Sequence, residues 1–241
     1  MNRAGVVVAG VDGCRAGWFV VVRYLETERV KHYVAPDFRE VLDGCDGASV
    51  IAVDIPIGLL DSVEEGGRPA DRYARKLLGR PRSSSVFSPP CRPALTSETY
   101  EQAAAATRAR SVKGRSLTRQ SFHLFRKLRE VDALMTPERQ EVVREAHPEL
   151  SFAAMNGGHA LVERKIRAEG RRLRIELLRA AGFASLEELP SASAGKDVNV
   201  DDVLDAYVCC WTAMRIARGD AERIPENPTR DPRGLLMEMW F

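Results

Sequence analysis

The sequence predicts an α/β fold in which a mixed five-stranded sheet is flanked by helices. Three β-branched segments separated by short turns open the chain, a short helix and a fourth apolar segment follow, and helical patterns fill most of the remainder. With 241 residues and 44% apolar side chains, the chain can bury a sizeable core. We therefore expect one domain over residues 1–241, with a helical insertion at about residues 68–140, after the fourth strand.

The first three strands are expected to form an antiparallel meander. Residues 5–11 and 17–24 are rich in β-branched and aromatic side chains and flank a short turn that contains glycine. Residues 31–34 continue the pattern. Because short connections join strands that run in opposite directions, these three segments should pair in sequence order.

A short helix and a fourth strand follow the meander. Asp37, with Glu40 three residues later, is typical of a capping box at a helix N-terminus. Residues 49–53 are then a buried strand, and a right-handed crossover places it parallel to the first strand and close to it. Since the C-terminal ends of these two strands meet, we expect Asp12 and Asp54 to lie near each other.

The middle of the chain is predicted to be helical. Residues 70–78, 97–110 and 118–135 have the apolar spacing of helices and are separated by glycine, proline and serine. Residues 80–93 read RPRSSSVFSPPCRP, and their four prolines and four serines exclude a regular helix. We expect a surface loop in that segment.

One more strand and two helices are expected after the insertion. Residues 142–147 predict a short strand that Pro148 ends, with Val143, Glu145 and His147 on one face. Helices are predicted over residues 161–181 and 200–218. The apolar face of the second helix should pack on the sheet and consists of Val203, Leu204, Tyr207, Cys210, Trp211 and Met214. Asp202 and Asp205 lie beside this face, near the start of the helix.

Four aspartates are therefore expected to converge at one edge of the sheet. They are Asp12, Asp54, Asp202 and Asp205. Carboxylates on rigid elements suit Mg²⁺ or Mn²⁺, and two such ions about 4 Å apart can hold the attacking and leaving oxygens in phosphodiester hydrolysis. The pattern predicts a divalent-metal site in which these residues are the catalytic ligands. Taken singly, an aspartate at a strand end usually forms a turn, and one in the first turn of a helix usually interacts with the helix dipole, so the prediction depends on their convergence.

Glu145 and His147 are further candidates for catalysis. Their alternation along the predicted strand points both side chains the same way. Glu145 would then be an additional metal ligand, and His147 a proton shuttle near neutral pH. The alternative is a turn at the end of the strand, in which the histidine only makes hydrogen bonds.

Basic and hydroxyl side chains near the proline-rich loop are candidates for binding phosphate, because guanidinium groups pair well with phosphate oxygens. The predicted substrate-binding residues are Arg75, Arg82, Ser84, Ser85 and Arg92. The helix predicted at residues 161–181 is strongly basic and is the best local patch for a nucleic-acid backbone. A solvated basic surface is the alternative in both places.

Composition and charge exclude several classes of protein. The formal net charge of +2 gives no global positive field of the kind that many nucleic-acid-binding proteins have. The five cysteines form no CxxC pair and no Cys/His spacing that suits structural zinc. No apolar stretch is long enough to cross a bilayer. We expect a cytoplasmic protein with reduced thiols.

Several segments resemble one known family. They are GVDGCRAGW (10–18), DIPIGL (54–59), RPADRYARKLLGRPRSSSVFSPPCRP (68–93), EAHPELSF (145–152) and DVLDAY (202–207). Over nearly the whole chain the sequence resembles the uncharacterised family described as "predicted nuclease, RNase H-like fold" (domain of unknown function 429). The resemblance implies an RNase H-like sheet. It also implies that Asp12, Asp54 and the pair Asp202 and Asp205 occupy the positions at which relatives such as Holliday-junction resolvases hold metal.

Three functional hypotheses follow. The first is a hydrolase, namely a Mg²⁺- or Mn²⁺-dependent nuclease or phosphodiesterase whose partner is DNA or RNA. The second is a small-molecule phosphoryl-transfer or nucleotide-binding protein of the actin and sugar-kinase superfamily, which shares this sheet, although the chain has one such half and no clear second Gly-rich phosphate loop. The third is a non-catalytic RNase H-like binding protein, which the near-neutral charge also fits.

Overall fold

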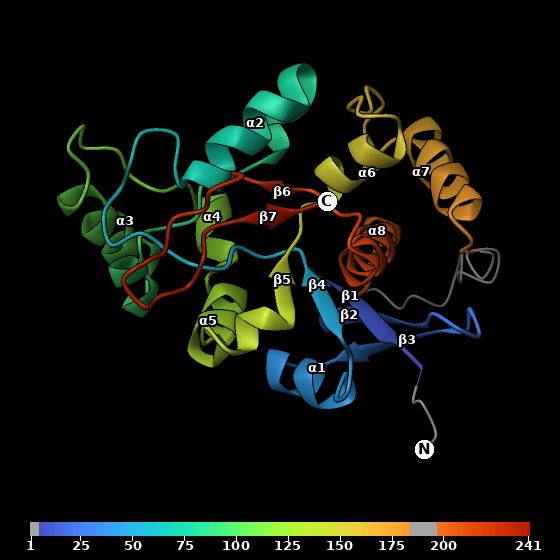
Figure 1. The fold of residues 1–241 in the computed structure, drawn as a ribbon. Helices are drawn as coiled ribbons and strands as arrows, with labels where there is room; N and C mark the ends of the chain where they lie inside the picture. Colours follow the sequence, from blue (N-terminus) through green and yellow to red (C-terminus); the bar gives the residue numbers. More distant parts are fainter. Residues whose placement is uncertain (1–4, 184–196) are drawn as a thin grey trace.

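The central feature of the molecule is a mixed five-stranded sheet. The computed structural model describes residues 5–183 and 197–241 (Figure 1). The strands are β1 (Val7–Cys14), β2 (Gly17–Tyr24), β3 (Val30–Ala35), β4 (Val50–Val53) and β5 (Val143–Glu145). Their order is β3-β2-β1-β4-β5, with β1, β2 and β3 antiparallel and β4 and β5 parallel to β1. The predicted α/β class and RNase H-like sheet are confirmed.

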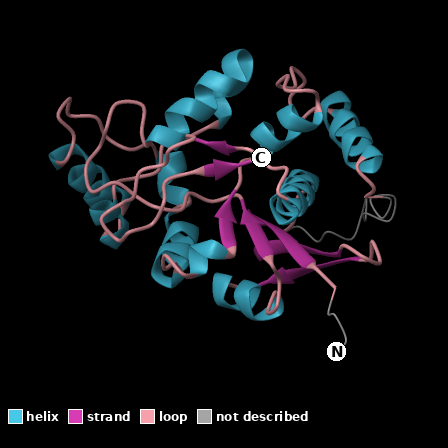
Figure 2. Ribbon diagram, in the orientation of Figure 1, coloured by secondary structure: helices cyan, strands magenta, loops and turns pink. Residues whose placement is uncertain are grey.

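Helices cover both faces of this sheet (Figure 2). On one face lies α8 (Val200–Arg218), with α7 (Ala168–Ala180) beside it; on the other lie α1 (Phe38–Gly44) and α5 (Phe125–Leu134). Side chains alternate between the two cores along each strand, as the period of two requires. In β1, for example, Val8 packs in the core with α8, whereas the next residue, Ala9, packs in the core with α1 and α5.

Gly10 allows α8 to pack directly against β1. A Cβ atom at this position would lie 2.0 Å from the backbone nitrogen of Cys210 and 2.2 Å from the carbonyl oxygen of Ala206. Because such distances are far inside van der Waals contact, only glycine permits this approach of helix to strand. The contact brings the first half of α8 beside the C-terminal end of β1.

The segment between β4 and β5 is largely helical. It contains α2 (Pro69–Arg82), α3 (Tyr100–Ala109), α4 (Arg119–His123) and α5, together with short 3₁₀ turns at Ser83–Ser85 and Arg92–Thr96. The regular part of α2 stops near the predicted end, since Gly79 and Arg80 have non-helical backbone angles. The single helix predicted over residues 118–135 is instead divided at Leu124.

Two predicted elements have different bounds in the structure. The strand predicted over residues 142–147 is only three residues long, because the proline after it begins an additional helix, α6 (Pro148–Met155). The helix predicted from residue 161 begins at residue 168. The carbonyls of residues 161–163 accept hydrogen bonds from Arg82 and Arg174, and this segment therefore stays outside the helix.

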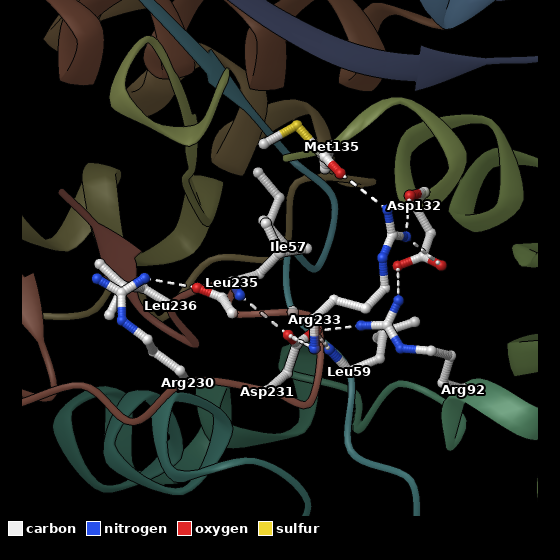
Figure 3. A network of polar contacts seen from close by, with 12 residues as sticks. Ile57, Leu59, Arg92, Asp132, Met135, Arg230, Asp231, Arg233, Leu235 and Leu236 are labelled. Carbon is white, nitrogen blue, oxygen red and sulfur yellow. Dashed lines mark hydrogen bonds and ion pairs between the residues drawn. The ribbon is translucent and has the colours of Figure 1, made fainter. Parts of the chain in front are cut away.

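The C-terminal segment was not assigned from the sequence. It returns across the molecule as the small hairpin β6 (Arg223–Ile224) and β7 (Met239–Trp240), next to α2 and α6 (Figure 1). A buried carboxylate fixes it to the loop after β4: Asp231 accepts hydrogen bonds from the backbone nitrogens of Leu59 at 2.9 Å and Leu235 at 3.0 Å (Figure 3). None of the helices in the described residues is both long and apolar enough to cross a membrane.

Candidate metal centre

Asp12 and Asp54 lie at the ends of adjacent parallel strands and face α8. Alternation places Asp12 on the same face as Val8, and it places Asp54 on the same face as Ala52; both apolar residues pack in the core with α8. The backbone nitrogen of Asp54 donates to the carbonyl of Val11 at 2.9 Å, which fixes the register of the two ends. The predicted proximity of the two aspartates is confirmed.

Asp205 joins this pair from α8. One carboxylate oxygen of each of Asp12, Asp54 and Asp205 can be chosen so that all three atoms lie within 4.8 Å of one another. Asp12 is 8% exposed and Asp205 is 2% exposed. The Oδ1 atom of Asp205 is buried and has no hydrogen-bond partner. A buried carboxylate oxygen without a donor is costly, so this geometry is typical of a site that receives a cation.

The pKa values of all three carboxyl groups are raised. For Asp12 the cause is burial first, then the charges of Asp54 and Asp205, and its pKa lies well above the ordinary value. Burial raises the pKa of Asp54 to about 6 and that of Asp205 to about 6 as well, although the positive charge of Lys165 opposes both shifts. Like charges held together out of water are destabilising, and a bound divalent ion would relieve this repulsion.

Two charged residues at this centre were not among the predicted site residues. The ammonium group of Lys165 contacts the Asp205 carboxylate, and Asp205, Asp12 and Asp54 raise its pKa even though burial opposes the charge. Glu149 lies close enough to raise the pKa of Asp54 and Asp205. Its Oε1 accepts a 2.7 Å hydrogen bond from Arg174, while its Oε2 is buried without a hydrogen-bond partner.

Asp202 was predicted as a fourth ligand, but the structure uses it to cap α8. Its Oδ2 accepts hydrogen bonds from the backbone nitrogen of Asn199 at 2.9 Å and from the Asn199 side chain at 3.2 Å. Among the described residues, only Asp12, Asp54 and Asp205 form a group with metal-ligand spacing. Asp202 is therefore near the centre as a charge that raises the pKa of Asp12, outside the three-carboxylate group itself.

Glu145 was also predicted as a ligand, and it points away from this group. Glu145 is two residues after Val143 in β5, so both side chains lie on the same face of the sheet. Val143 packs in the core with α1 and α5, on the face opposite α8. There Glu145 forms a buried ion pair with Arg68, at 2.7 Å, and accepts a 2.6 Å hydrogen bond from the backbone nitrogen of Ile57. The Arg68 guanidinium also pairs with Asp71 at 2.7 Å. This network fixes the loop that follows Asp54.

A cavity of about 420 Å³ opens beside Asp54 and Asp205, two members of the three-carboxylate group. Its wall includes the candidate residues Arg82, Ser84, Ser85 and His147, together with Asp54, Glu149, Arg164, Lys165 and Asp205. Burial lowers the pKa of His147, which therefore favours the neutral imidazole, and its Nδ1 has no hydrogen-bond partner. Only the N-terminal part of the proline-rich segment, at Arg82, Ser84 and Ser85, therefore lies beside the acidic residues.

The other two predicted phosphate-binding arginines make internal contacts. Arg75 donates to the carbonyls of Val86 at 2.9 Å and Gly66 at 2.6 Å, and it lines a second hollow rather than the cavity. Arg92 forms ion pairs with Asp132 and Asp231 (Figure 3). Since their guanidinium groups are engaged in this way, both arginines hold loops in place.

Comparison with known proteins identifies the family of the chain. Neither the curated proteins nor the solved structures include a match to it. A family model described as "Protein of unknown function (DUF429)" matches residues 10–230, which is most of the chain. The protein therefore belongs to this DUF429 family, as the resemblance of its motifs implied.

Proposed function

We propose that the protein is a divalent-metal-dependent phosphodiesterase, and that Asp12, Asp54 and Asp205 hold Mg²⁺ or Mn²⁺. The observation that carries the proposal is the convergence of three carboxylates within 4.8 Å, one of them with a buried oxygen that lacks a hydrogen-bond donor. Hard cations such as Mg²⁺ and Mn²⁺ prefer oxygen ligands of this kind, whereas zinc prefers histidine and cysteine. The donor set thus fits the proposed ions.

The chemistry of the proposed reaction is divided between the metal and the chain. A bound divalent ion would act as a Lewis acid on the phosphate oxygens and offset their negative charge. The residues that line the cavity would bind the phosphodiester and accept a proton. Arg164 presents positive charge to a phosphodiester entering it, while Arg82, whose guanidinium donates to the carbonyls of residues 161 and 162, adds its charge to the cavity wall. The neutral imidazole of His147 can accept a proton from the attacking water.

A nucleic acid is the substrate that we propose, because the cavity continues into a second hollow. This hollow measures about 610 Å³ and shares Ser84, Ser85 and Gln120 with the cavity. Its wall combines apolar side chains, including Phe87 and Leu117, with polar ones, which suits a nucleotide next to the scissile phosphate. We also propose that the protein acts in the cytoplasm, since all five cysteines are free thiols.

A cleavage assay tests this proposal. The assay would compare wild type, Asp205→Asn and the exposed control Asp46→Asn. The nucleic-acid substrates would be single-stranded and double-stranded DNA and RNA and a branched DNA, and the small esters would be mononucleotides and a small synthetic phosphodiester. We expect Mn²⁺- or Mg²⁺-dependent cleavage by wild type and Asp46→Asn, abolished by EDTA and by Asp205→Asn. Cleavage of only the small esters would assign a small-molecule substrate. No metal-dependent cleavage of any substrate would contradict the proposed reaction.

A further inference from the structure

One cation of the chain already lies at the three-carboxylate group. The ammonium of Lys165 contacts Oδ2 of Asp205, while Oδ1 of the same carboxylate is buried and lacks a hydrogen-bond partner. Asp205 is also the residue that joins Asp12 and Asp54 within 4.8 Å. The ammonium therefore already supplies positive charge to a carboxylate that would also hold a divalent ion.

The backbone around Lys165 is anchored, but its side chain can move. Arg171 donates to the carbonyl of Lys165 at 3.1 Å and pairs with Asp201 of α8, also at 3.1 Å. Just upstream, Arg82 binds the carbonyls of residues 161 and 162. The Lys165 side chain itself is 38% exposed and lines the cavity. A lysine stem has four flexible methylene groups, so the ammonium can leave Asp205 while the backbone stays in place.

We propose that Lys165 is a built-in competitor of the divalent ion, which neutralises Asp205 in the metal-free protein and is displaced when metal binds. This inference rests on the proposed function, because it concerns the regulation of the same site. The three carboxylates can carry three negative charges against the single positive charge of Lys165, so the group still attracts a divalent ion. Competition lowers the apparent metal affinity. It also releases a cation into the cavity, beside Arg164, when metal is bound.

Isothermal titration with Mn²⁺ tests this inference. Lys165→Met removes the ammonium and keeps most of the apolar stem, so we expect its Mn²⁺ dissociation constant to be smaller than that of wild type by on the order of tenfold. Lys165→Arg keeps the charge and should bind Mn²⁺ no more tightly than wild type. The matched control is Arg167→Met, which removes an exposed charge from the same segment and should leave the affinity unchanged.

The possible results separate the inference from the proposed function. If wild type binds Mn²⁺ and Lys165→Met binds it equally or more weakly, Lys165 supports the site structurally and the inference is overturned. If wild type and all variants fail to bind Mn²⁺, the proposed metal centre itself is wrong. Circular dichroism establishes that each variant is folded, and Lys165→Gln is the second variant if Lys165→Met does not fold. A tighter Kd for either neutral variant supports competition.

Discussion

Replacing Asp54 with asparagine should stabilise the metal-free protein at neutral and alkaline pH. Burial raises the pKa of Asp54 from its ordinary value of 3.8 to about 6. A rise of about two units corresponds to roughly 3 kcal/mol, at 1.36 kcal/mol per unit. Because the folded protein binds the proton more tightly than the unfolded chain, this carboxyl group lowers stability as the pH rises through 6. Asparagine carries no charge and avoids the loss.

The size of the effect should depend on pH in a defined way. At pH 8 and in EDTA, Asp54→Asn should be more stable than wild type by up to about 3 kcal/mol, or about 6–12 °C in Tm for a chain of this length. Below about pH 3 the two proteins should be nearly equal, because Asp54 is then protonated in both the folded state and the unfolded state, whose pKa is 3.8. Urea denaturation at both pH values measures this, with Asp46→Asn as the exposed control. Equal or lower stability of Asp54→Asn at pH 8 would refute the reasoning.

Three other variants test how the chain builds the site. Arg68→Met leaves Glu145 and Asp71 buried without their partner and should cost about 3–5 kcal/mol in urea denaturation; a cost below 1 kcal/mol would contradict the role of this network. Arg92→Met should lower stability by about 1–3 kcal/mol yet leave Mn²⁺ affinity unchanged, and weaker Mn²⁺ binding would show that Arg92 belongs to the centre. Gly10→Ala should separate α8 from β1 and weaken Mn²⁺ binding, whereas wild-type affinity would show that this contact does not position Asp205.

The sequence predicts much of the three-carboxylate group because side chains alternate along a strand and because the order of the elements fixes which strand ends are neighbours. The β-branched runs and the crossover helix were sufficient to place Asp12 and Asp54 at adjacent strand ends, because the side-chain period of a strand is fixed. The helical spacing of residues 200–218 likewise predicted that α8 packs on the sheet. The sequence also contains a signal that distinguishes Asp202 from Asp205. Asn199, three residues before Asp202, is the sequence signal of a reciprocal cap, and this cap holds the Asp202 carboxylate outside the three-carboxylate group.

The remaining features depend on contacts between distant segments. Pro148 begins a helix, so Glu149 turns toward Asp54 and Asp205, while Glu145 remains on the opposite face of the sheet. Lys165 reaches Asp205 from the segment before α7, in which Arg82 and Arg174 bind the carbonyls of residues 161–163. No local pattern reports such long-range hydrogen bonds. The ion pair of Arg92 could not be predicted from local sequence either, since its partner Asp231 lies in the C-terminal segment, 139 residues away.

The central claim, that Asp12, Asp54 and Asp205 hold a divalent ion, is tested most directly by Mn²⁺-induced thermal stabilisation of wild type and Asp12→Asn. Asparagine keeps the oxygen that accepts a 2.7 Å hydrogen bond from the backbone nitrogen of Gly13, so the turn should survive. A ligand stabilises only the state that binds it. We predict that Mn²⁺ raises the Tm of wild type and that Asp12→Asn loses most of this shift while remaining folded. Equal Mn²⁺-induced shifts in the two proteins would contradict the claim.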